Sequence, residues 1–373
     1  MLMAQKVVAM ILAGGKGTRL KALTKKIAKP AVHFGGKYRI IDFSLSNVAN
    51  SDITVCGVLT QYESAVLSNY VGNGSTWGFD GVNGKCQSLA PHQTEEGANW
   101  YNGTADAIYQ NLDFLDDEEP DYVLILSGDH IYKTTYNDMI NLHISSGAVC
   151  TISVIEVAWE EASRFGILEV DSNDQITKFV EKPKKPQSNL ASMGIYVFSY
   201  KELRKALIED AKDPNSSHDF GSNIIPTLLK ENKKVMAYRF SGYWRDVGTL
   251  DSLHAANMEL LPSMGKEDII HFSEFPTVFS EDTHSMPQYI GKDAIVDDSL
   301  INQGAIILGQ VSQSVISNEV LVDEKAKVVR SYVMPGARIG KGAYVENAIV
   351  GPNVKIKDGE VINKNNEGVV LVD

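Results

Sequence analysis

Residues 13–20, Ala13-Gly14-Gly15-Lys16-Gly17-Thr18-Arg19-Leu20, follow an apolar run from Val7 to Leu12 that is typical of a buried strand. Three glycines in four positions let the backbone turn sharply and approach a ligand closely. The N–H groups of such a turn, with Lys16 and Arg19 beside them, can face phosphate oxygens. The spacing matches neither a Walker loop nor the dinucleotide-binding G-x-G-x-x-G. The stretch therefore predicts a phosphate-binding loop after the first strand of an α/β domain.

The first 262 residues alternate between apolar strand-like runs and helical stretches. This alternation favours a mostly parallel sheet covered by helices, in which ligands bind at the carboxyl ends of the strands. A helix is expected from Thr249 to Leu261, with Thr249 or Asp251 as its N-cap. The strand-like runs are Val7 to Leu12, Val55 to Leu59, Tyr122 to Leu126, Val149 to Val154 and Gly194 to Phe198.

From Pro287 onward the sequence changes to short apolar steps separated by Gly and Asn. Apolar residues recur every six positions, at 294, 300 and 306, at 290 and 296, and at 337, 343 and 349. This rhythm predicts a left-handed parallel β-helix of stacked coils, with a β-sandwich as the alternative. The predicted division is therefore a catalytic domain at 1–262, a linker at 263–286 and a β-helix domain at 287–373.

Composition narrows the class of protein. The 373 residues are 43% hydrophobic and 22% charged, which is enough to bury a full core. A formal net charge of −12 gives no basic tract for nucleic acid or for an acidic membrane surface. No apolar segment approaches the roughly 20 residues that a membrane span needs, so we expect a cytoplasmic protein. Cys56, Cys86 and Cys150 are odd in number and widely spaced, which indicates buried thiols.

Two carboxylates stand where a predicted strand ends or a predicted helix begins. Asp129 follows the buried run Tyr122 to Leu126 and a glycine, in Ser127-Gly128-Asp129-His130. Asp246 precedes a predicted helix start in Trp244-Arg245-Asp246-Val247-Gly248-Thr249. Carboxylate oxygens at the ligand-binding edge of a sheet suit Mg²⁺, which usually stays bridged to substrate phosphates. A turn at Asp129 and a helix cap at Asp246 are the alternative readings.

The glycine loop continues through Lys29-Pro30-Ala31-Val32 and Phe34-Gly35-Gly36-Lys37-Tyr38-Arg39-Ile40-Ile41-Asp42. With these runs the chain closely resembles the sugar-phosphate nucleotidyltransferases and, among them, the bacterial glucose-1-phosphate adenylyltransferases, over nearly its whole length. The resemblance implies a Rossmann-like domain followed by a left-handed β-helix. It also implies the reaction of ATP with α-D-glucose 1-phosphate to give ADP-glucose and pyrophosphate, in glycogen biosynthesis.

The resemblance also implies the catalytic, nucleotide and metal residues. Attack of a sugar-phosphate oxygen on the α-phosphorus of ATP gathers negative charge, so fixed cations must surround both phosphates. Arg19 and Lys29 match positions that engage the triphosphate, and Asp129 and Asp246 match the pair that holds Mg²⁺. The catalytic set is Arg19, Lys29 and Asp129, and the predicted ATP-binding residues are Gly14, Gly15, Gly17, Thr18, Arg19, Gln93, Gly103 and Thr104.

A third group matches family positions that bind glucose 1-phosphate. Lys182 corresponds to the lysine that holds the sugar phosphate, and the others offer hydrogen bonds or packing to the sugar, because a buried polar group without a partner is costly. A protease reading of Ser216-Ser217-His218-Asp219 lacks the chain order and the strand–turn context of a catalytic triad. The predicted group is Tyr101, Gly166, Glu181, Lys182, Ser192, Tyr196, Asp219, Phe220 and Trp244.

Other classes of function stay open at this point. The chain could be a non-catalytic subunit that assembles with an active one, or could use another nucleoside triphosphate. A hexapeptide acyltransferase is disfavoured because no histidine follows His284 in the sequence. By resemblance the β-helix supports a tetramer, made either of identical copies or with a related second subunit.

Overall fold

The computed structural model describes residues 5–15, 17–91, 93, 94, 97, 98, 100–261, 263 and 275–373. The chain forms two compact units, each assembled from separate segments. The sheet unit comprises Met1–Gly15, Asn47–Gly128 and Thr134–Gly242. The β-helix unit comprises Lys16–Ser46, Asp129–Lys133 and Tyr243–Asp373. The division predicted at residues 262 and 287 stays a prediction, and each compact unit is described by itself.

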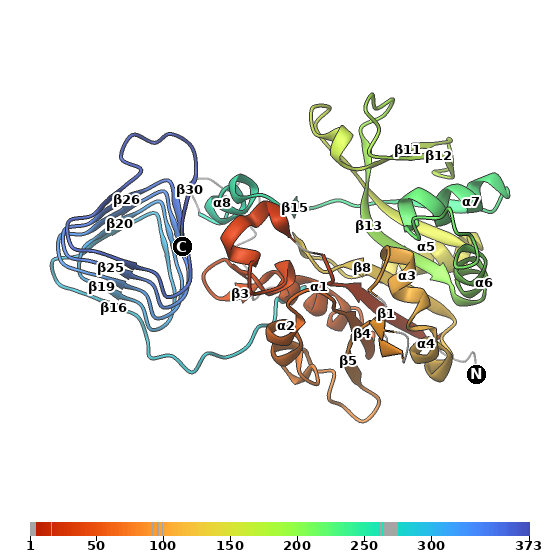
Figure 1. The fold of residues 1–373 in the computed structure, drawn as a ribbon, viewed down its shortest axis with the longest axis horizontal. Coiled ribbons are helices and arrows are strands. Elements are labelled where there is room, and N and C mark those ends of the chain that lie inside the picture. The colour runs from red at the N-terminus through yellow and green to blue at the C-terminus, as the bar shows by residue number, and fades with distance from the viewer. Residues whose placement is uncertain are drawn as a thin grey trace. The chain divides into compact units, whose positions relative to one another are not determined.

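The sheet unit is built on a nine-stranded mixed sheet within the described chain (Figure 1). Its main path runs β12-β11-β13-β8-β1-β4-β5, and β10 pairs with both β13 and β14. Strands β8, β1, β4 and β5 are parallel, as the alternating sequence predicts. The strands are β1 (Val7–Leu12), β4 (Val55–Leu59), β5 (Lys85–Leu89), β8 (Tyr122–Ser127), β10 (Cys150–Glu156), β11 (Gly166–Val170), β12 (Ile176–Glu181), β13 (Leu190–Ser199) and β14 (Val235–Arg239).

Both faces of the central strands are buried. In β8, Val123 and Ile125 pack into a core with four helices, α3 (Thr104–Tyr109), α4 (Leu112–Glu118), α6 (Tyr200–Asp210) and α7 (Ile225–Lys230). The alternating Leu124 and Leu126 point to the opposite face and are also fully buried. This explains the uninterrupted apolar run in the sequence. The three cysteines are free and buried, as predicted.

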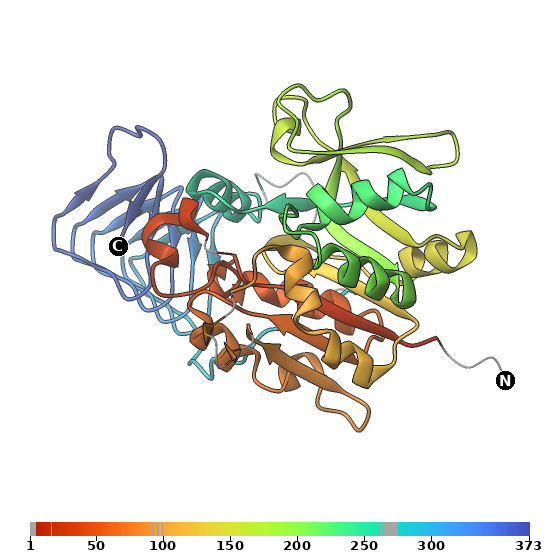
Figure 2. The same cartoon turned by 45° about the vertical axis from the view of Figure 1, so that its right-hand side comes forward.

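Short helices connect the strands, and Figure 2 shows the green helices α6 and α7 alongside the strands of the same unit. In the described residues, no helix combines the length and the apolar character that crossing a membrane requires. The helices are α1 (Ile40–Ala49), which passes from one unit to the other, α2 (Ser64–Val71), α3 (Thr104–Tyr109), α4 (Leu112–Glu118), α5 (Asn137–Ser146), α6 (Tyr200–Asp210), α7 (Ile225–Lys230) and α8 (Leu250–Met258) of the β-helix unit.

Three parallel sheets of five strands each form the β-helix within residues 275–373, which Figure 1 shows as stacked blue coils. The predicted β-helix is therefore present, and the sandwich alternative is wrong. The first sheet holds β16 (Tyr289–Ile290), β19 (Ile306–Ile307), β22 (Leu321–Val322), β25 (Arg338–Ile339) and β28 (Lys355–Ile356). The second holds β17 (Ile295–Asp297), β20 (Gln310–Ser312), β23 (Lys327–Val329), β26 (Tyr344–Glu346) and β29 (Val361–Ile362), and the third holds β18 (Leu300–Ile301), β21 (Val315–Ile316), β24 (Tyr332–Val333), β27 (Ala348–Val350) and β30 (Val370–Val372).

The six-residue rhythm describes the later coils better than the first. Ala337, Ala343 and Ile349 are all buried, as that rhythm predicts. Ile306 is 42% exposed, and its neighbours Ala305 and Ile307 are the residues that fill the interior. Ile306 pairs with Leu321 in the next coil, so this coil is shorter than three full hexapeptides. The sequence rhythm therefore loses register there.

A serine ladder runs along one corner of the β-helix. The Ser314 hydroxyl donates to the carbonyl oxygen of Ser312 and accepts the N–H of Ser331, at 2.7 and 3.1 Å. Ser331 repeats this pattern with Val329 and with the N–H of Ala348, at 2.7 and 3.2 Å. Each coil thereby satisfies a backbone donor of the next.

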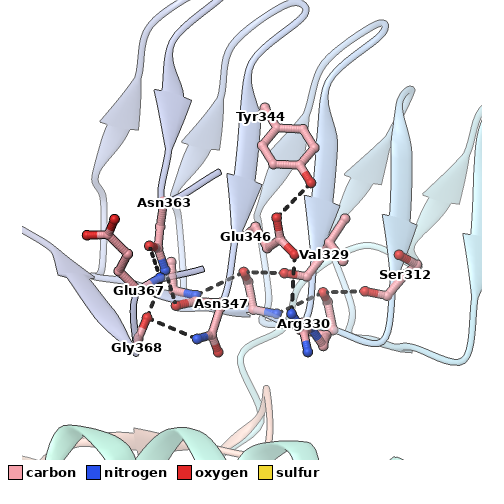
Figure 3. A network of polar contacts seen from close by, with 12 residues as sticks. Ser312, Val329, Arg330, Tyr344, Glu346, Asn347, Asn363, Glu367 and Gly368 are labelled. Atoms are coloured by element: carbon pink, nitrogen blue, oxygen red, sulfur yellow. Dashed lines mark hydrogen bonds and ion pairs between the residues drawn. The ribbon is translucent and has the colours of Figure 1, made fainter. Parts of the chain in front are cut away.

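A network of polar contacts continues along the same edge, as Figure 3 shows. The Arg330 guanidinium lies 3.2 Å from the Glu346 carboxylate, which also accepts the Tyr344 hydroxyl at 2.8 Å. Asn363 donates to the carbonyl oxygen of Asn347 at 3.2 Å. The backbone at Arg330, Asn347 and Asn363 has positive φ, which marks the turns.

Segments from distant parts of the chain pack on the β-helix inside its unit. Leu20 and Phe34 share a buried core with Leu253 of α8 and with Tyr332 of β24. Thr249 caps α8 by accepting the N–H of Ser252, which confirms one of the two predicted caps. The shorter pieces of this unit are η1 (Thr18–Thr24), η2 (Lys29–Ala31), β2 (His33–Phe34), β3 (Tyr38–Arg39), β9 (His130–Tyr132) and β15 (Trp244–Asp246).

The remaining short elements belong to the sheet unit. They are η3 (Ser75–Trp77), β6 (Gln93–Thr94), β7 (Gly97–Ala98), η4 (Ala162–Arg164) and the π-helical turn η5 (Phe220–Ile224).

Candidate active site

The predicted phosphate loop leads from β1 into η1. Gly17 has φ of 59°, in the left-handed region that favours glycine. A Cβ on Gly17 would lie 3.0 Å from the Cβ of Lys29, and the Thr24 hydroxyl donates to the Gly17 carbonyl at 2.8 Å. Glycine at this position therefore allows the backbone to lie against Lys29. Lys16 lies outside the described residues.

The other loop residues assigned to ATP are distributed over both units. Thr18 and Arg19 are exposed in the β-helix unit. One terminal guanidinium nitrogen of Arg19 lies 2.8 Å from the position that a Cβ on Gly248 would occupy. Arg19 therefore reaches the turn that follows β15. The sheet unit contains Gly14 and Gly15.

Lys29 lies between two carboxylates. Its Nζ is 2.7 Å from Asp129 Oδ2 and 3.0 Å from Asp246 Oδ1. The lysine side chain is 6% exposed, whereas those of Asp129 and Asp246 are 31% and 15% exposed. The structure therefore brings together three residues that the sequence assigned to the reaction centre. We call them the lysine–carboxylate cluster.

An antiparallel ladder creates this cluster. Strand β9 begins directly after Asp129, and β15 ends at Asp246. The two strands pair so that Asp246 lies opposite His130. Residues far apart in the sequence are thus held side by side by backbone hydrogen bonds.

Electrostatics stabilises the charged forms of Lys29 and Asp246. Burial alone would lower the pKa of Lys29, but the carboxylates of Asp129 and Asp246 raise it above its ordinary value. Burial alone would raise the pKa of Asp246, but Lys29 holds it below its ordinary value. The cluster is therefore a charged network.

His130 is a member of the site that the sequence reasoning missed. Its Nε2 lies 3.5 Å from Asp129 Oδ1, and its ring packs edge-on against Trp244, with centroids 5.0 Å apart. Burial lowers the pKa of His130, which favours the neutral ring. Its position next to Asp129 in the sequence was the available signal.

The same residues can hold a metal ion. Asp129, His130 and Asp246 each offer one ligand atom, and these atoms lie within 4.8 Å of one another. In the part of the chain that the structure describes, this is the one such group of His, Cys, Asp and Glu. The ammonium of Lys29 between the carboxylates shows that the pair accepts a cation. Two carboxylate oxygens suit a hard divalent ion.

Arg245 makes a structural contact beside this cluster. Its guanidinium lies 2.6 Å from Glu259, which also accepts the Tyr243 hydroxyl at 2.6 Å. Hydrogen bonding to Glu259 raises the pKa of Arg245. This pair links β15 to the end of α8.

The sheet unit holds most of the predicted sugar residues. Glu181 Oε2 lies 2.8 Å from the position of a Cβ on Gly166 and 2.5 Å from that of a Cβ on Gly221. Lys182 extends into solvent, with its side chain 66% exposed and its Nζ 2.8 Å from Glu181 Oε1. The Glu181 carboxylate thus lies against two glycines, one of them in the predicted set.

The side chain of Tyr196 lies close to the carboxylates of Glu181 and Asp219. Tyr196 stacks on Phe220 with ring centroids 5.6 Å apart, and both belong to the buried core. Burial raises the pKa of Tyr196. The carboxylates of Glu181 and Asp219 raise it further, and a hydrogen bond with Ser192 lowers it. The tyrosine therefore remains a neutral hydrogen-bonding group.

Asp219 is fixed by neutral donors. Its carboxylate accepts the Thr104 hydroxyl at 2.8 Å and the N–H of Ser222 at 2.9 Å. The Thr104 oxygen in turn accepts the N–H of Phe220 at 3.1 Å. One residue predicted for ATP and two predicted for the sugar therefore form a single hydrogen-bonded group, which we call the threonine–aspartate cluster.

Three further predicted residues are not members of either the lysine–carboxylate cluster or the group around Asp219. The Tyr101 hydroxyl donates to the carbonyl of Leu89 at 3.3 Å and accepts from Asn111 at 3.0 Å, at the edge of the core. Trp244 belongs to the β-helix unit, beside His130. Gln93 forms part of β6, and its side chain lies outside the described part of the structure. The assignments of all site residues stay predictions.

Comparisons with known proteins agree with this fold. Residues 8–263 match the model of the family described as nucleotidyl transferase, and residues 284–368 match the one described as GlmU-like, C-terminal hexapeptide. A protein of Bacillus cytotoxicus named glucose-1-phosphate adenylyltransferase is 53% identical over 375 residues, covering 100% of this chain and 99% of the relative. Proteins of the same name from Bacillus thuringiensis and Bacillus anthracis are each 53% identical over 371 residues, covering 99% of this chain and 98% of the relatives. The chain belongs to the nucleotidyl transferase family and, within it, to the glucose-1-phosphate adenylyltransferases.

Proposed function

We propose that this chain transfers the adenylyl group of ATP to α-D-glucose 1-phosphate and releases pyrophosphate. The product is ADP-glucose, the glucosyl donor expected for glycogen biosynthesis. An oxygen of the sugar phosphate attacks the α-phosphorus, and the bond from that phosphorus to the bridging oxygen of pyrophosphate breaks. The name of the relatives supports the two substrates.

The observation that carries the proposal is the lysine–carboxylate cluster. A buried ammonium held between two carboxylates is costly to assemble for stability alone, because each ion loses its hydration. The same three charges can place a cation and phosphate groups together. Phosphoryl transfer needs mainly such positioning and fixed charge.

The proposed divalent ion is Mg²⁺, held by Asp129 and Asp246. When bound, it would neutralise phosphate charge that develops during the transfer. The chain's own cations do the rest: Lys29 remains beside these carboxylates and can turn its ammonium toward phosphate oxygens. Arg19 lies next to Gly248, in the turn that follows β15, and can bind the triphosphate.

The sugar side uses a different kind of group. Lys182 has an exposed ammonium that can pair with the phosphate of glucose 1-phosphate. The carboxylates of Glu181 and Asp219 accept hydrogen bonds from sugar hydroxyls. Their positions are fixed by neighbouring glycines and by Thr104, which favours one orientation of the sugar.

The deciding experiment is pyrophosphate release by the purified chain alone. The reaction contains Mg²⁺ and glucose 1-phosphate, with ATP, UTP, GTP or dTTP in parallel, and a control without sugar phosphate. Release with ATP that depends on glucose 1-phosphate supports the proposal. Release with another nucleotide only, or silence from folded protein with every nucleotide, contradicts it, and silence favours the non-catalytic subunit.

The tetramer, of one or two kinds of subunit, and the cytoplasmic location also stay predictions. Light scattering of the purified chain tests the first. A mass of one or two chains at assay concentration would contradict a tetramer of identical copies.

A further inference from the structure

His218 joins two helices and the predicted sugar site within the sheet unit. It follows α6 and precedes η5, with a backbone φ of 52°. Its Nδ1 lies 2.7 Å from Oδ2 of Asp210, the last residue of α6. The side chains are only 21% and 13% exposed, so the contact is largely shielded from water.

The backbone of His218 also completes the start of α3. Its carbonyl oxygen accepts the N–H groups of Ala105 and Asp106, at 2.8 and 3.2 Å. These are first-turn donors, for which a helix offers no partner of its own. Gly103 precedes them, and a Cβ on it would collide with the His218 carbonyl oxygen. The glycine thus allows this close approach.

The same turn sets the next residue. Asp219 accepts the Thr104 hydroxyl at 2.8 Å, and Thr104 is the first residue of α3. One loop therefore fixes residues predicted for ATP, Gly103 and Thr104, and a residue predicted for the sugar, Asp219. Any shift of the loop moves both groups.

We propose that His218, anchored by Asp210, is a positioning residue that sets the nucleotide side and the sugar side of the site together. The inference rests on the proposed function, because it concerns the two substrates of that reaction. His218 itself need touch neither substrate: its ring holds the loop, and its carbonyl holds α3.

The left-handed backbone explains why an anchor is needed. Positive φ costs free energy in a residue other than glycine and persists only where surrounding contacts impose it. The hydrogen bond from the Nδ1–H of His218 to the carboxylate of Asp210 is such a contact, and the Ser216 hydroxyl bonds to the same carboxylate at 2.6 Å. Loss of the ring contact allows the loop to relax.

The test is a steady-state comparison of His218→Asn with the wild-type chain. Asparagine tolerates the left-handed conformation but is too short to replace the imidazole contact. His284→Asn is the matched control, because His284 also has φ of 52° and faces an aspartate, Asp282, but its side chain is 87% exposed. Asp210→Asn changes the other partner of the same contact: it replaces the carboxylate that His218 faces and keeps an oxygen that can accept the Ser216 hydroxyl.

The wild-type chain is first shown to form ADP-glucose with Mg²⁺, and failure at this step refutes the proposed function rather than this inference. For His218→Asn and Asp210→Asn we expect the KM of ATP and the KM of glucose 1-phosphate to rise together, each about tenfold, with kcat within about threefold. The His284→Asn values match wild type. A change confined to one substrate, a loss of kcat alone, or unchanged constants in both variants overturns the inference.

Discussion

The lysine–carboxylate cluster and the threonine–aspartate cluster both hold carboxylates, but by different means. In the first, a buried ammonium compensates the charges of Asp129 and Asp246. In the second, a hydroxyl and a backbone N–H hold Asp219, and no cation takes part in those two hydrogen bonds. The first is organised by charge and the second by the shape of a turn.

This difference indicates which kind of ligand group each cluster can bind. A carboxylate pair that already surrounds one cation can accept another cation with little change in shape. A carboxylate fixed by directional neutral donors keeps one orientation and suits the recognition of hydroxyl groups. Charge removal should therefore damage the first cluster most, and loss of geometry the second.

The largest expected effect is on stability, from Lys29→Met. This change leaves two carboxylates facing each other without their ammonium, so we expect the free energy of unfolding to fall by about 4 kcal/mol. Urea unfolding with and without Mg²⁺ measures it. Mg²⁺ should restore part of the loss, and an unchanged midpoint in both conditions would show that the cluster is not organised by charge. Lys182→Met, at an exposed lysine, is the control for stability.

The next effect is on turnover, from Asp129→Asn. The amide keeps the size of the side chain but removes one charge from the site, so we expect kcat to fall by at least about 100-fold. The assay is pyrophosphate release in a Mg²⁺ titration, with thermal unfolding as the check of folding. Near-normal turnover at any Mg²⁺ concentration would refute the assignment.

A smaller effect is expected from Lys182→Ala. Its ammonium is exposed and can pair with the sugar phosphate, so the KM of glucose 1-phosphate should rise about tenfold, and the KM of ATP should change little. Kinetics with each substrate varied in turn distinguishes these constants. Unchanged KM and kcat for glucose 1-phosphate would count against this role.

The smallest effect is expected from Thr104→Val. It removes the hydrogen bond to Asp219 and leaves the N–H of Phe220 without its acceptor, so we expect a loss of about 1 kcal/mol in stability. The KM of glucose 1-phosphate should rise several-fold in the same variant. Thr104→Ser keeps the hydroxyl and should restore both values. Equal behaviour of the two variants would show that the hydroxyl does not hold Asp219.

Much of the fold could be predicted from the sequence because its signals are local. The apolar run of β8 is buried on both faces, and the six-residue rhythm at residues 337, 343 and 349 matches buried positions. Ile306 is the exception: its apolar character suggested an inward side chain, but coil length depends on how Ile306 pairs with Leu321. Such pairing between coils is not visible in a local pattern.

The candidate site was predictable in its residue types but not in its contacts. Asp129 and Asp246 stood out as carboxylates at element ends. The place of Lys29 between them depends on the pairing of β9 with β15, which brings distant segments together. His130 and His218 stood in the sequence beside Asp129 and Asp219, but a single histidine is compatible with many roles, so their contacts could not be predicted.

The serine ladder of the β-helix makes each coil a template for the next. Ser314 and Ser331 repeat the same two hydrogen bonds, whereas Ala348 only donates its N–H to Ser331 and has no hydroxyl that could accept the N–H of a further coil. The pattern thus has a direction and an end. Excision of residues 314–330 would bring the Ser299 hydroxyl, which now accepts the N–H of Ser314, to the N–H of Ser331. Insertions and deletions of whole coils can therefore lengthen or shorten this part of the molecule and keep the hydrogen bonds between coils.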